Sequence, residues 1–117
     1  MMTKLIYLAS PYSHHDAAVR QLRFEIVSRV AARLMSGGLH VFSPISHTHP
    51  IAEYGSLPLG WDFWEQYDRA IMGVCSRMIV LMLDGWEQSR GVQAEVSLAV
   101  EFGLDIEYMH YDMSSKT

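Results

Sequence analysis

The run MIVLML at residues 78–83 is the most hydrophobic stretch of the chain, and it decides the fold class. Arg77 precedes this run, and Asp84 and Gly85 follow it as a turn. A short, uninterrupted apolar run bounded by turn residues is typical of a parallel strand that helices bury on both faces. It is also far too short to span a bilayer. The run therefore predicts the central strand of an α/β sheet.

The segments on both sides of this run alternate between short apolar strands and amphipathic helices. The order β-α-β-loop-α-β-α-β is typical of an α/β fold with right-handed crossovers. We expect one domain over residues 1–117, an open three-layer parallel sheet of the flavodoxin or Rossmann type, with four to five strands and helices on both faces. The expected strands cover residues 5–9, 39–43, 78–83 and 106–109, the helices begin at residue 15 or 16, at residue 61 and after Gly91, and residues 43–60 form a long loop.

Composition restricts the kind of partner. The chain has 117 residues, 50% of them hydrophobic, and a net charge of -4 from 9 basic and 13 acidic residues. Because it has no basic run, we expect no nucleic-acid partner and favour a small molecule. The single cysteine, Cys75, excludes an internal disulfide and a cysteine-based zinc site. We therefore expect a cytoplasmic protein with no membrane partner.

The helix after Gly91 carries an acid where its packing pattern asks for an apolar residue. The inward stripe of this helix would consist of Val92, Glu95, Val96, Ala99 and Gly103. A carboxylate on such a face must be paired, protonated or used in chemistry, because burying a bare charge is expensive. Glu95 is therefore the best catalytic candidate. The alternative is that it only complements the helix dipole or a nearby backbone donor.

The preceding helix shows a second acid on an apolar stripe. Asp68 interrupts a stripe that also contains Trp61, Trp64, Ile71 and Cys75. A role in the site is one interpretation. The other is structural, with Asp68 at the edge of the helix or in a salt bridge to Arg69 or Arg77.

Several segments end at the same edge of the predicted sheet. In open parallel sheets, ligands bind in the crevice beyond the carboxyl ends of the strands. The polar and turn residues that follow the predicted strands or open the Glu95 helix are Ser10, Pro11, Ser43, Asp84, Ser89 and Arg90. We expect these residues to line a small-molecule site, with Glu95 one to two helical turns behind them.

Motifs of other enzyme classes are missing from the sequence. It contains no GxxxxGK[ST], no GxGxxG after the first strand and no GxSxG, which disfavours P-loop enzymes, dinucleotide-dependent oxidoreductases and serine hydrolases. His47 and His49 invite a metal interpretation, but no third ligand lies at a supporting spacing. We expect no metal, and histidines that hydrogen-bond or line the site.

Four stretches together resemble the nucleoside 2-deoxyribosyltransferase superfamily. They are LIYLASPY at residues 5–12, the helix with Asp68, the strand that ends in Asp84-Gly85, and SRGVQAEVSLA at residues 89–99. The motifs SPYSH and SPISHTHPIA look most like a small bacterial and phage family of unassigned function that shares this fold. The resemblance implies cleavage or transfer at the N-glycosidic bond of a nucleoside or nucleotide. It also implies that no cofactor is needed and that the protein is a homodimer or homotetramer.

The resemblance also implies a role for each matching residue. Glu95 matches the glutamate nucleophile of the superfamily, and Tyr7 matches a tyrosine that holds this nucleophile. Asp68 lies near the position where the superfamily has an aspartate, on the helix that precedes the nucleophile. Asp68 or Asp84 would bind the sugar hydroxyls or protonate the departing base, and Tyr12 is a further aromatic candidate near the sugar.

One position departs from the transferases. Where they carry an aspartate ahead of the nucleophile, this chain has Ser89, followed by Arg90 and Gly91. This pattern resembles the 2'-deoxynucleoside 5'-monophosphate N-glycosidases of the same superfamily, whose serine-glycine turn binds the 5'-phosphate. A helix N-terminus offers unpaired N–H groups and a positive dipole end, which suits a phosphate. Alternatively, Ser89 is only an N-cap, and the rival function is a non-catalytic nucleotide-binding or sensor module.

Overall fold

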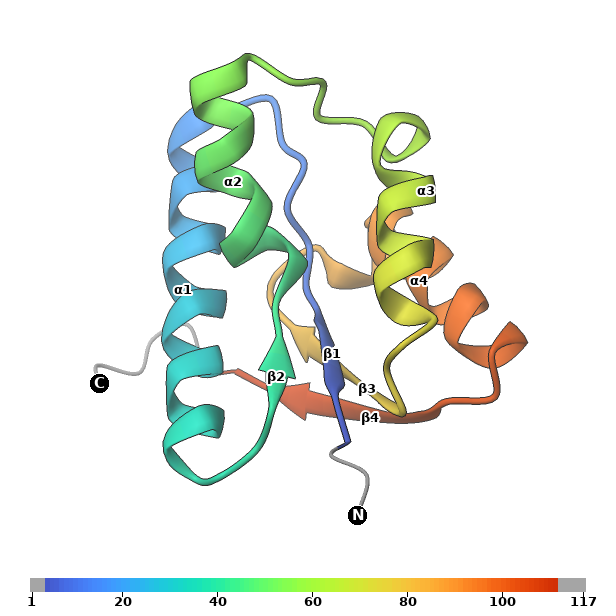
Figure 1. The fold of residues 1–117 in the computed structure, drawn as a ribbon. Helices are drawn as coiled ribbons and strands as arrows, with labels where there is room; N and C mark the ends of the chain where they lie inside the picture. The colour runs from blue at the N-terminus through green and yellow to red at the C-terminus, as the bar shows by residue number, and fades with distance from the viewer. Residues whose placement is uncertain (1–3, 112–117) are drawn as a thin grey trace.

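The computed structural model describes residues 4–111, which form a four-stranded parallel sheet in the order β2-β1-β3-β4 (Figure 1). The strands are β1 (Ile6–Ala9), β2 (Val41–Phe42), β3 (Arg77–Met82) and β4 (Asp105–His110). The helices are α1 (Ala17–Ser36), α2 (Pro44–Gly55), α3 (Trp61–Met72) and α4 (Arg90–Glu101), with a short 3-10 helix η1 at Trp86–Gln88. Within the described residues, no helix is long and apolar enough to cross a membrane. The predicted α/β sheet is confirmed.

The two central strands bury side chains on both faces. In β1, Ile6 and Leu8 pack into one core cluster with residues of α1. The alternate residues, Tyr7 and Ala9, pack into a second cluster with residues of α3 and α4. Figure 1 shows α1 on one side of the sheet and α3 and α4 on the other. The inner four residues of β3 are all buried, so the predicted central strand is confirmed.

The order in which the chain adds strands to the sheet reverses at β1. After β1, helix α1 leads the chain to β2 on one side, and β3 later pairs on the other side of β1. Ile6 of β1 accordingly lies opposite Val41 of β2 and Arg77 of β3. The carboxyl ends of β1 and β3 thus form a topological switch point, where ligands bind in open parallel sheets.

The expected loop at residues 43–60 is wrong, because most of it is helix α2. Pro44 is at the start of this helix, where a missing N–H is tolerated. Ser43 caps it, and its Oγ accepts a hydrogen bond from Ser46 N at 3.2 Å. Pro50 lies inside the helix. Packing of α2 against α1 therefore outweighs the low helix propensity of its prolines.

Ser43→Ala is expected to lower the free energy of unfolding by about 1 kcal/mol, the usual effect of losing a side-chain N-cap. Urea denaturation measures this change. The control is Ser36→Ala at the exposed end of α1, which is expected to stay within about 0.5 kcal/mol of the parent. Equal effects in the two variants would contradict the capping role of Ser43.

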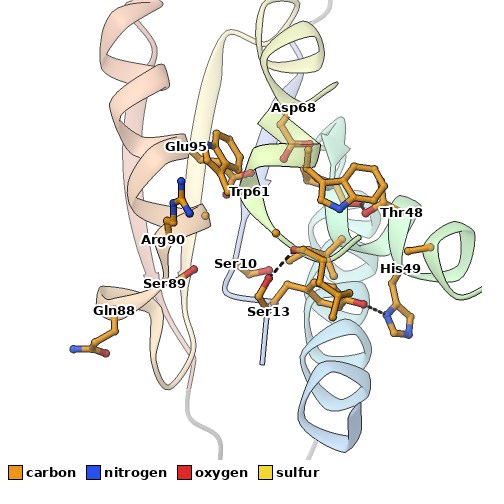
Figure 2. A pocket seen from close by; sticks show the side chains of 18 residues that line it. Ser10, Ser13, Thr48, His49, Trp61, Asp68, Gln88, Ser89, Arg90 and Glu95 are labelled. Carbon is orange, nitrogen blue, oxygen red and sulfur yellow. Dashed lines mark hydrogen bonds between the residues drawn. The ribbon is translucent and has the colours of Figure 1, made fainter. Parts of the chain in front are cut away.

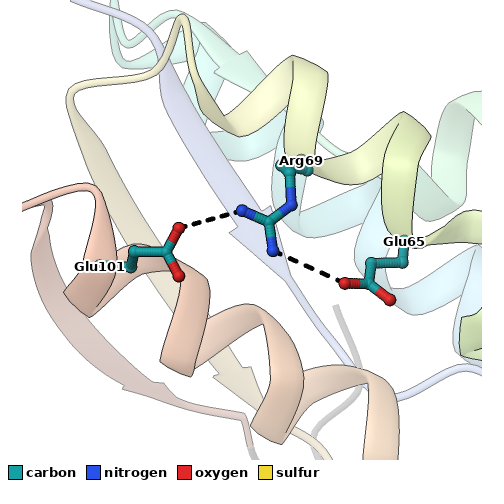
Figure 3. A network of polar contacts seen from close by, with 3 residues as sticks. All are labelled: Glu65, Arg69 and Glu101. Atoms are coloured by element: carbon teal, nitrogen blue, oxygen red, sulfur yellow. Dashed lines mark hydrogen bonds and ion pairs between the residues drawn. The ribbon is translucent and has the colours of Figure 1, made fainter.

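Charge pairs join α3 to α4 near both ends. At one end, Arg69 lies between Glu65 of its own helix at 3.6 Å and Glu101 of α4 at 3.0 Å (Figure 3). Near the other end, Arg90 of α4 lies 2.8 Å from Asp62 of α3. Exposed pairs contribute little to stability, usually below about 1 kcal/mol each. The position of these pairs is more informative than their contribution to stability, because both predicted catalytic acids lie on these helices between the two pairs.

Candidate functional site

A cavity of about 290 Å³ lies at the carboxyl edge of the sheet. Its walls come from the loop after β1, from α2, and from the first turns of α3 and α4 (Figure 2). This volume is near the lower end of the range of about 300–1,000 Å³ that is typical of small-molecule sites. The lining residues are Ser10, Tyr12, Ser13, Pro44, Ile45, Thr48, His49, Ala52, Leu59, Gly60, Trp61, Trp64, Asp68, Gln88, Ser89, Arg90, Gly91 and Glu95.

Glu95 is buried, as its place on the α4 stripe predicts, and it lines the cavity. The fully buried Tyr7 of β1 donates its hydroxyl proton to Glu95 Oε2. Burial, together with the nearby charge of Asp68, raises the pKa of Glu95 to about 8, and the Tyr7 hydrogen bond opposes this rise. Burial and the charge of Glu95 raise the pKa of Tyr7 well above its usual value. Tyr7 therefore keeps its proton and acts as a donor.

Asp68 of α3 is the second buried acid of the cavity. Its exposed fraction is 7%, and burial raises its pKa to about 7. The salt bridge considered as a structural alternative is not formed, because Arg69 pairs with glutamates and Arg77 pairs with Glu107 at 2.8 Å. The cavity thus holds two acids that influence each other's charge and titrate near neutral pH.

Ser10, at the end of β1, has an unsatisfied hydroxyl group. Its Oγ is the one buried side-chain nitrogen or oxygen in residues 4–111 that has no hydrogen-bond partner. Leaving such a group unpaired costs about 1–3 kcal/mol. A ligand atom that completes this hydrogen bond would recover that free energy, so the position of Ser10 in the cavity lining favours a binding role.

The first residues of α4 combine a cap with a possible anion site. Ser89 is the N-cap, since its Oγ accepts a hydrogen bond from Val92 N at 3.2 Å. This confirms the capping role without excluding an anion, because the first N–H groups of a helix have no intrahelical acceptor. Arg90 also lines the cavity, but its Nη2 lies 2.8 Å from Asp62 Oδ1. An anion bound here would share Arg90 with Asp62.

The structure brings most of the predicted site residues together. The predicted residues that line the cavity are Ser10, Tyr12, Asp68, Ser89, Arg90, Gly91 and Glu95. Tyr7 is not part of the lining, and it reaches the site through its hydrogen bond to Glu95.

Three predicted binding residues do not line the cavity. Pro11 is fully buried, and the Ser43 hydroxyl caps α2. Asp84 is exposed on the loop after β3, where its carbonyl oxygen accepts a hydrogen bond from Arg23 Nη2 at 3.1 Å. The backbone turns directly after it at Gly85, which has a φ of +89°.

Sequence reasoning missed most of the wall that α2 contributes and expected only its histidines to hydrogen-bond or line the site. The residues of this wall, which follow the i, i+3, i+4, i+7 spacing of a helix face, are Ile45, Thr48, His49 and Ala52. That spacing is the signal that identifies the wall, and the prolines of the segment obscured it. Trp61 and Trp64 also line the cavity, although the sequence places them only on the apolar stripe that Asp68 interrupts.

The two histidines of α2 have different surroundings. His49 is buried and hydrogen-bonds Tyr12 and Gln21, whereas His47 is exposed and its ring lies 6.3 Å from that of Tyr67. Within residues 4–111, no three side chains of His, Cys, Asp or Glu gather in a way that could hold a metal ion.

Residues 4–111 match the family described as "Domain of unknown function (DUF1937)". Because this match covers nearly the whole chain, the chain belongs to that family. A comparison with curated proteins finds no match. The functional interpretation therefore depends on the chemistry of the site.

Proposed function

We propose that this member of the family cleaves or transfers at the N-glycosidic bond of a nucleoside or nucleoside 5'-monophosphate, with Glu95 as the nucleophile. The observation that carries the proposal is the hydrogen bond from Tyr7 to Glu95, next to Asp68, at a cavity of about 290 Å³. Buried acids with raised pKa values in a cleft are typical of catalytic acid and base groups. The resemblance to nucleoside 2-deoxyribosyltransferases points to the same three residues.

In the proposed reaction, ionised Glu95 attacks the anomeric carbon of the sugar. The C–N bond breaks, and its electron pair leaves with the base, which takes a proton from Asp68. Water or a second base then attacks the anomeric carbon, gives a proton to Asp68 and releases Glu95. This cycle requires no metal or organic cofactor.

The two acids need to hold one proton between them for this reaction. Mutual repulsion of two ionised carboxylates favours the singly protonated pair near neutral pH. Burial raises the pKa of both acids, and the reaction needs the shared proton on Asp68 and the charge on Glu95. The hydrogen bond from Tyr7 stabilises a charge on Glu95, and so lowers the free energy needed to reach the reactive arrangement with the proton on Asp68.

The start of α4 supports a 5'-phosphate as part of the substrate. Ser89 and Arg90 line this end of the cavity, and a helix N-terminus favours an anion electrostatically. The unpaired hydroxyl of Ser10 is a further donor for a ligand oxygen.

Arg90→Ala is expected to weaken binding of a nucleoside 5'-monophosphate by about 1.5–3 kcal/mol, the worth of a charge-assisted hydrogen bond, and to leave nucleoside binding nearly unchanged. Asp62→Asn is the matched variant, since it removes the charge that pairs with Arg90 at 2.8 Å. It is expected to tighten binding of the monophosphate only. Isothermal titration measures both effects, and equal losses for both ligands in Arg90→Ala remove the phosphate assignment.

The proposed activity is tested by incubating the protein with nucleosides and 5'-monophosphates and separating free base by chromatography. Release of base supports the proposal. A rise in melting temperature with nucleotides, without base release from any of them, supports a non-catalytic nucleotide-binding or sensor module instead. If no compound is cleaved or bound, both functions are excluded.

We also propose that the protein is a homodimer or homotetramer in the cytoplasm. Large apolar side chains are exposed on α2 and α3 beside the cavity, including Tyr54 at 94% and Phe63 at 48%. Exposed apolar groups of this size favour association. Sedimentation equilibrium measures the state, and a monomer at micromolar concentration contradicts this proposal.

A further inference from the structure

Three hydroxyl groups line one wall of the cavity, on the side of α2 and of the loop after β1. They belong to Tyr12, Ser13 and Thr48. Ser13 Oγ donates to the carbonyl oxygen of Leu59 at 2.9 Å, and Thr48 Oγ1 donates to the carbonyl oxygen of Pro44 at 2.8 Å. A carbonyl oxygen only accepts, so both hydroxyl protons are directed into the protein.

The direction of the Tyr12 hydrogen bond follows from a chain of contacts that begins on α1. Gln21 Nε2 donates to Glu25 Oε2 at 2.9 Å, which turns the amide oxygen of Gln21 toward His49 Nε2 at 3.0 Å. An amide oxygen only accepts, so His49 donates from Nε2, and in the tautomer with its single proton on Nε2 the lone pair is on Nδ1. Tyr12 Oη, 2.5 Å from this Nδ1, is therefore the donor.

Ser13 and Thr48 consequently present oxygen lone pairs, and no proton, to the cavity. The Tyr12 hydroxyl also directs its proton into the protein, and Arg20 shares its oxygen as a second hydrogen-bond partner. We call Tyr12, Ser13 and Thr48 the acceptor wall. Figure 2 shows Thr48 and His49 on the side opposite Ser89 and Arg90. The helix N-terminus and Arg90 supply donors at that opposite side. The cavity is thus divided into an end with donors, suited to an anion, and an end with acceptors.

We propose that the acceptor wall selects a nucleobase with an exocyclic amino group, which donates its N–H protons to these oxygens. The inference rests on the proposed function for the orientation of the ligand, with the phosphate at the start of α4 and the base at the acceptor wall. A base with a carbonyl oxygen in place of the amino group puts this oxygen next to a hydroxyl oxygen of the wall, and both are acceptors. Both oxygens then lose their hydrogen bonds to water and gain none.

The proposal is tested by isothermal titration with adenosine, inosine, cytidine and uridine 5'-monophosphates, each in ribose and deoxyribose form. Within the purine or the pyrimidine pair that binds, the amino member is expected to bind at least about tenfold more tightly than the oxo member. The N6,N6-dimethyl derivative of adenosine 5'-monophosphate lacks the donor protons. It is expected to bind about tenfold more weakly than adenosine 5'-monophosphate. Equal affinities for amino and oxo members overturn the proposal.

These experiments distinguish a failure of the acceptor wall from a failure of the proposed catalysis. A preference for amino bases without base release keeps the acceptor wall and removes the proposed catalysis. Base release without such a preference removes the acceptor wall and keeps the catalysis. If none of the monophosphates binds, the acceptor wall is overturned, and the proposed catalysis is overturned as well when no nucleoside releases its base.

Gln21→Ala tests the wall from outside the cavity, because Gln21 is exposed on α1. Without the amide, His49 is free to carry its proton on Nδ1 and donate to Tyr12, whose own proton then points to the ligand. The preference for the amino base is expected to fall several-fold. Tyr12→Phe removes the oxygen itself and is expected to have the same effect. Arg29→Ala, also exposed on α1, is the control and is expected to keep the preference. An unchanged preference in both test variants overturns the proposal.

Discussion

Glu95→Gln is expected to slow base release roughly a thousandfold or more, while the protein stays folded. The amide keeps the shape of the side chain and can still accept a hydrogen bond from Tyr7. It cannot carry the negative charge that an oxocarbenium-like centre needs. Chromatography of the released base and the melting temperature, measured on the same preparation, separate an effect on catalysis from an effect on folding.

Glu101→Gln is the matched control for this experiment. Glu101 lies on the same helix, is exposed and pairs with Arg69 outside the cavity lining. Its variant is expected to release base within a few-fold of the parent rate. If Glu95→Gln also stays within a few-fold of that rate and folds normally, Glu95 is not the nucleophile, and Asp68 becomes the next acid to test.

The folded protein is expected to lose stability as the pH rises from about 5 to about 8. The pKa of Glu95 rises from 4.5 to about 8 on folding because of burial and the charge of Asp68. Between these two values the folded state binds more protons than the unfolded state, so the free energy of unfolding falls as the pH rises. Below the unfolded-state pKa both states are protonated, and the full stability is present.

Glu95→Gln is expected to remove the part of this pH dependence that comes from Glu95 and to keep the part that comes from Asp68, whose pKa burial also raises, to about 7. Relative to the parent, the variant should gain roughly 2–4 kcal/mol of unfolding free energy between pH 5 and pH 8, from about 1.4 kcal/mol per pKa unit reduced by local relaxation. Urea denaturation at both pH values measures the gain. Comparing the two proteins cancels the titration of the 6 histidines, which both contain. Parallel pH profiles would mean that folding does not raise the pKa of Glu95.

Together, the two expected effects of Glu95→Gln distinguish catalysis from structure. A group that lowers stability in its charged form and is still needed for activity is typical of an active site. A helix-dipole partner or a structural acid would show the opposite result. The amide would then change stability by about 1 kcal/mol and leave base release largely intact.

Local sequence patterns were sufficient for features that depend on one element. The apolar run at residues 78–83 predicted a strand buried on both faces, and the spacing along α4 put Glu95 on the buried side. Even there the agreement is incomplete, since Leu98 is buried and Val96 is only half-buried. Such features follow from sequence because a helix or strand repeats its inward side every few residues.

Contacts between distant segments were decided only by the tertiary structure. The strand order brings Tyr7 to Glu95 across 88 positions of sequence, and the family resemblance, not any local pattern, suggested that contact. Helix α2 forms despite its prolines because it packs on α1, and this helix places His49 beside Tyr12. Asp84 follows a central strand yet lies outside the cavity. Whether a polar side chain faces a cavity depends on where several elements pack relative to one another, and that arrangement minimises the free energy of the whole core.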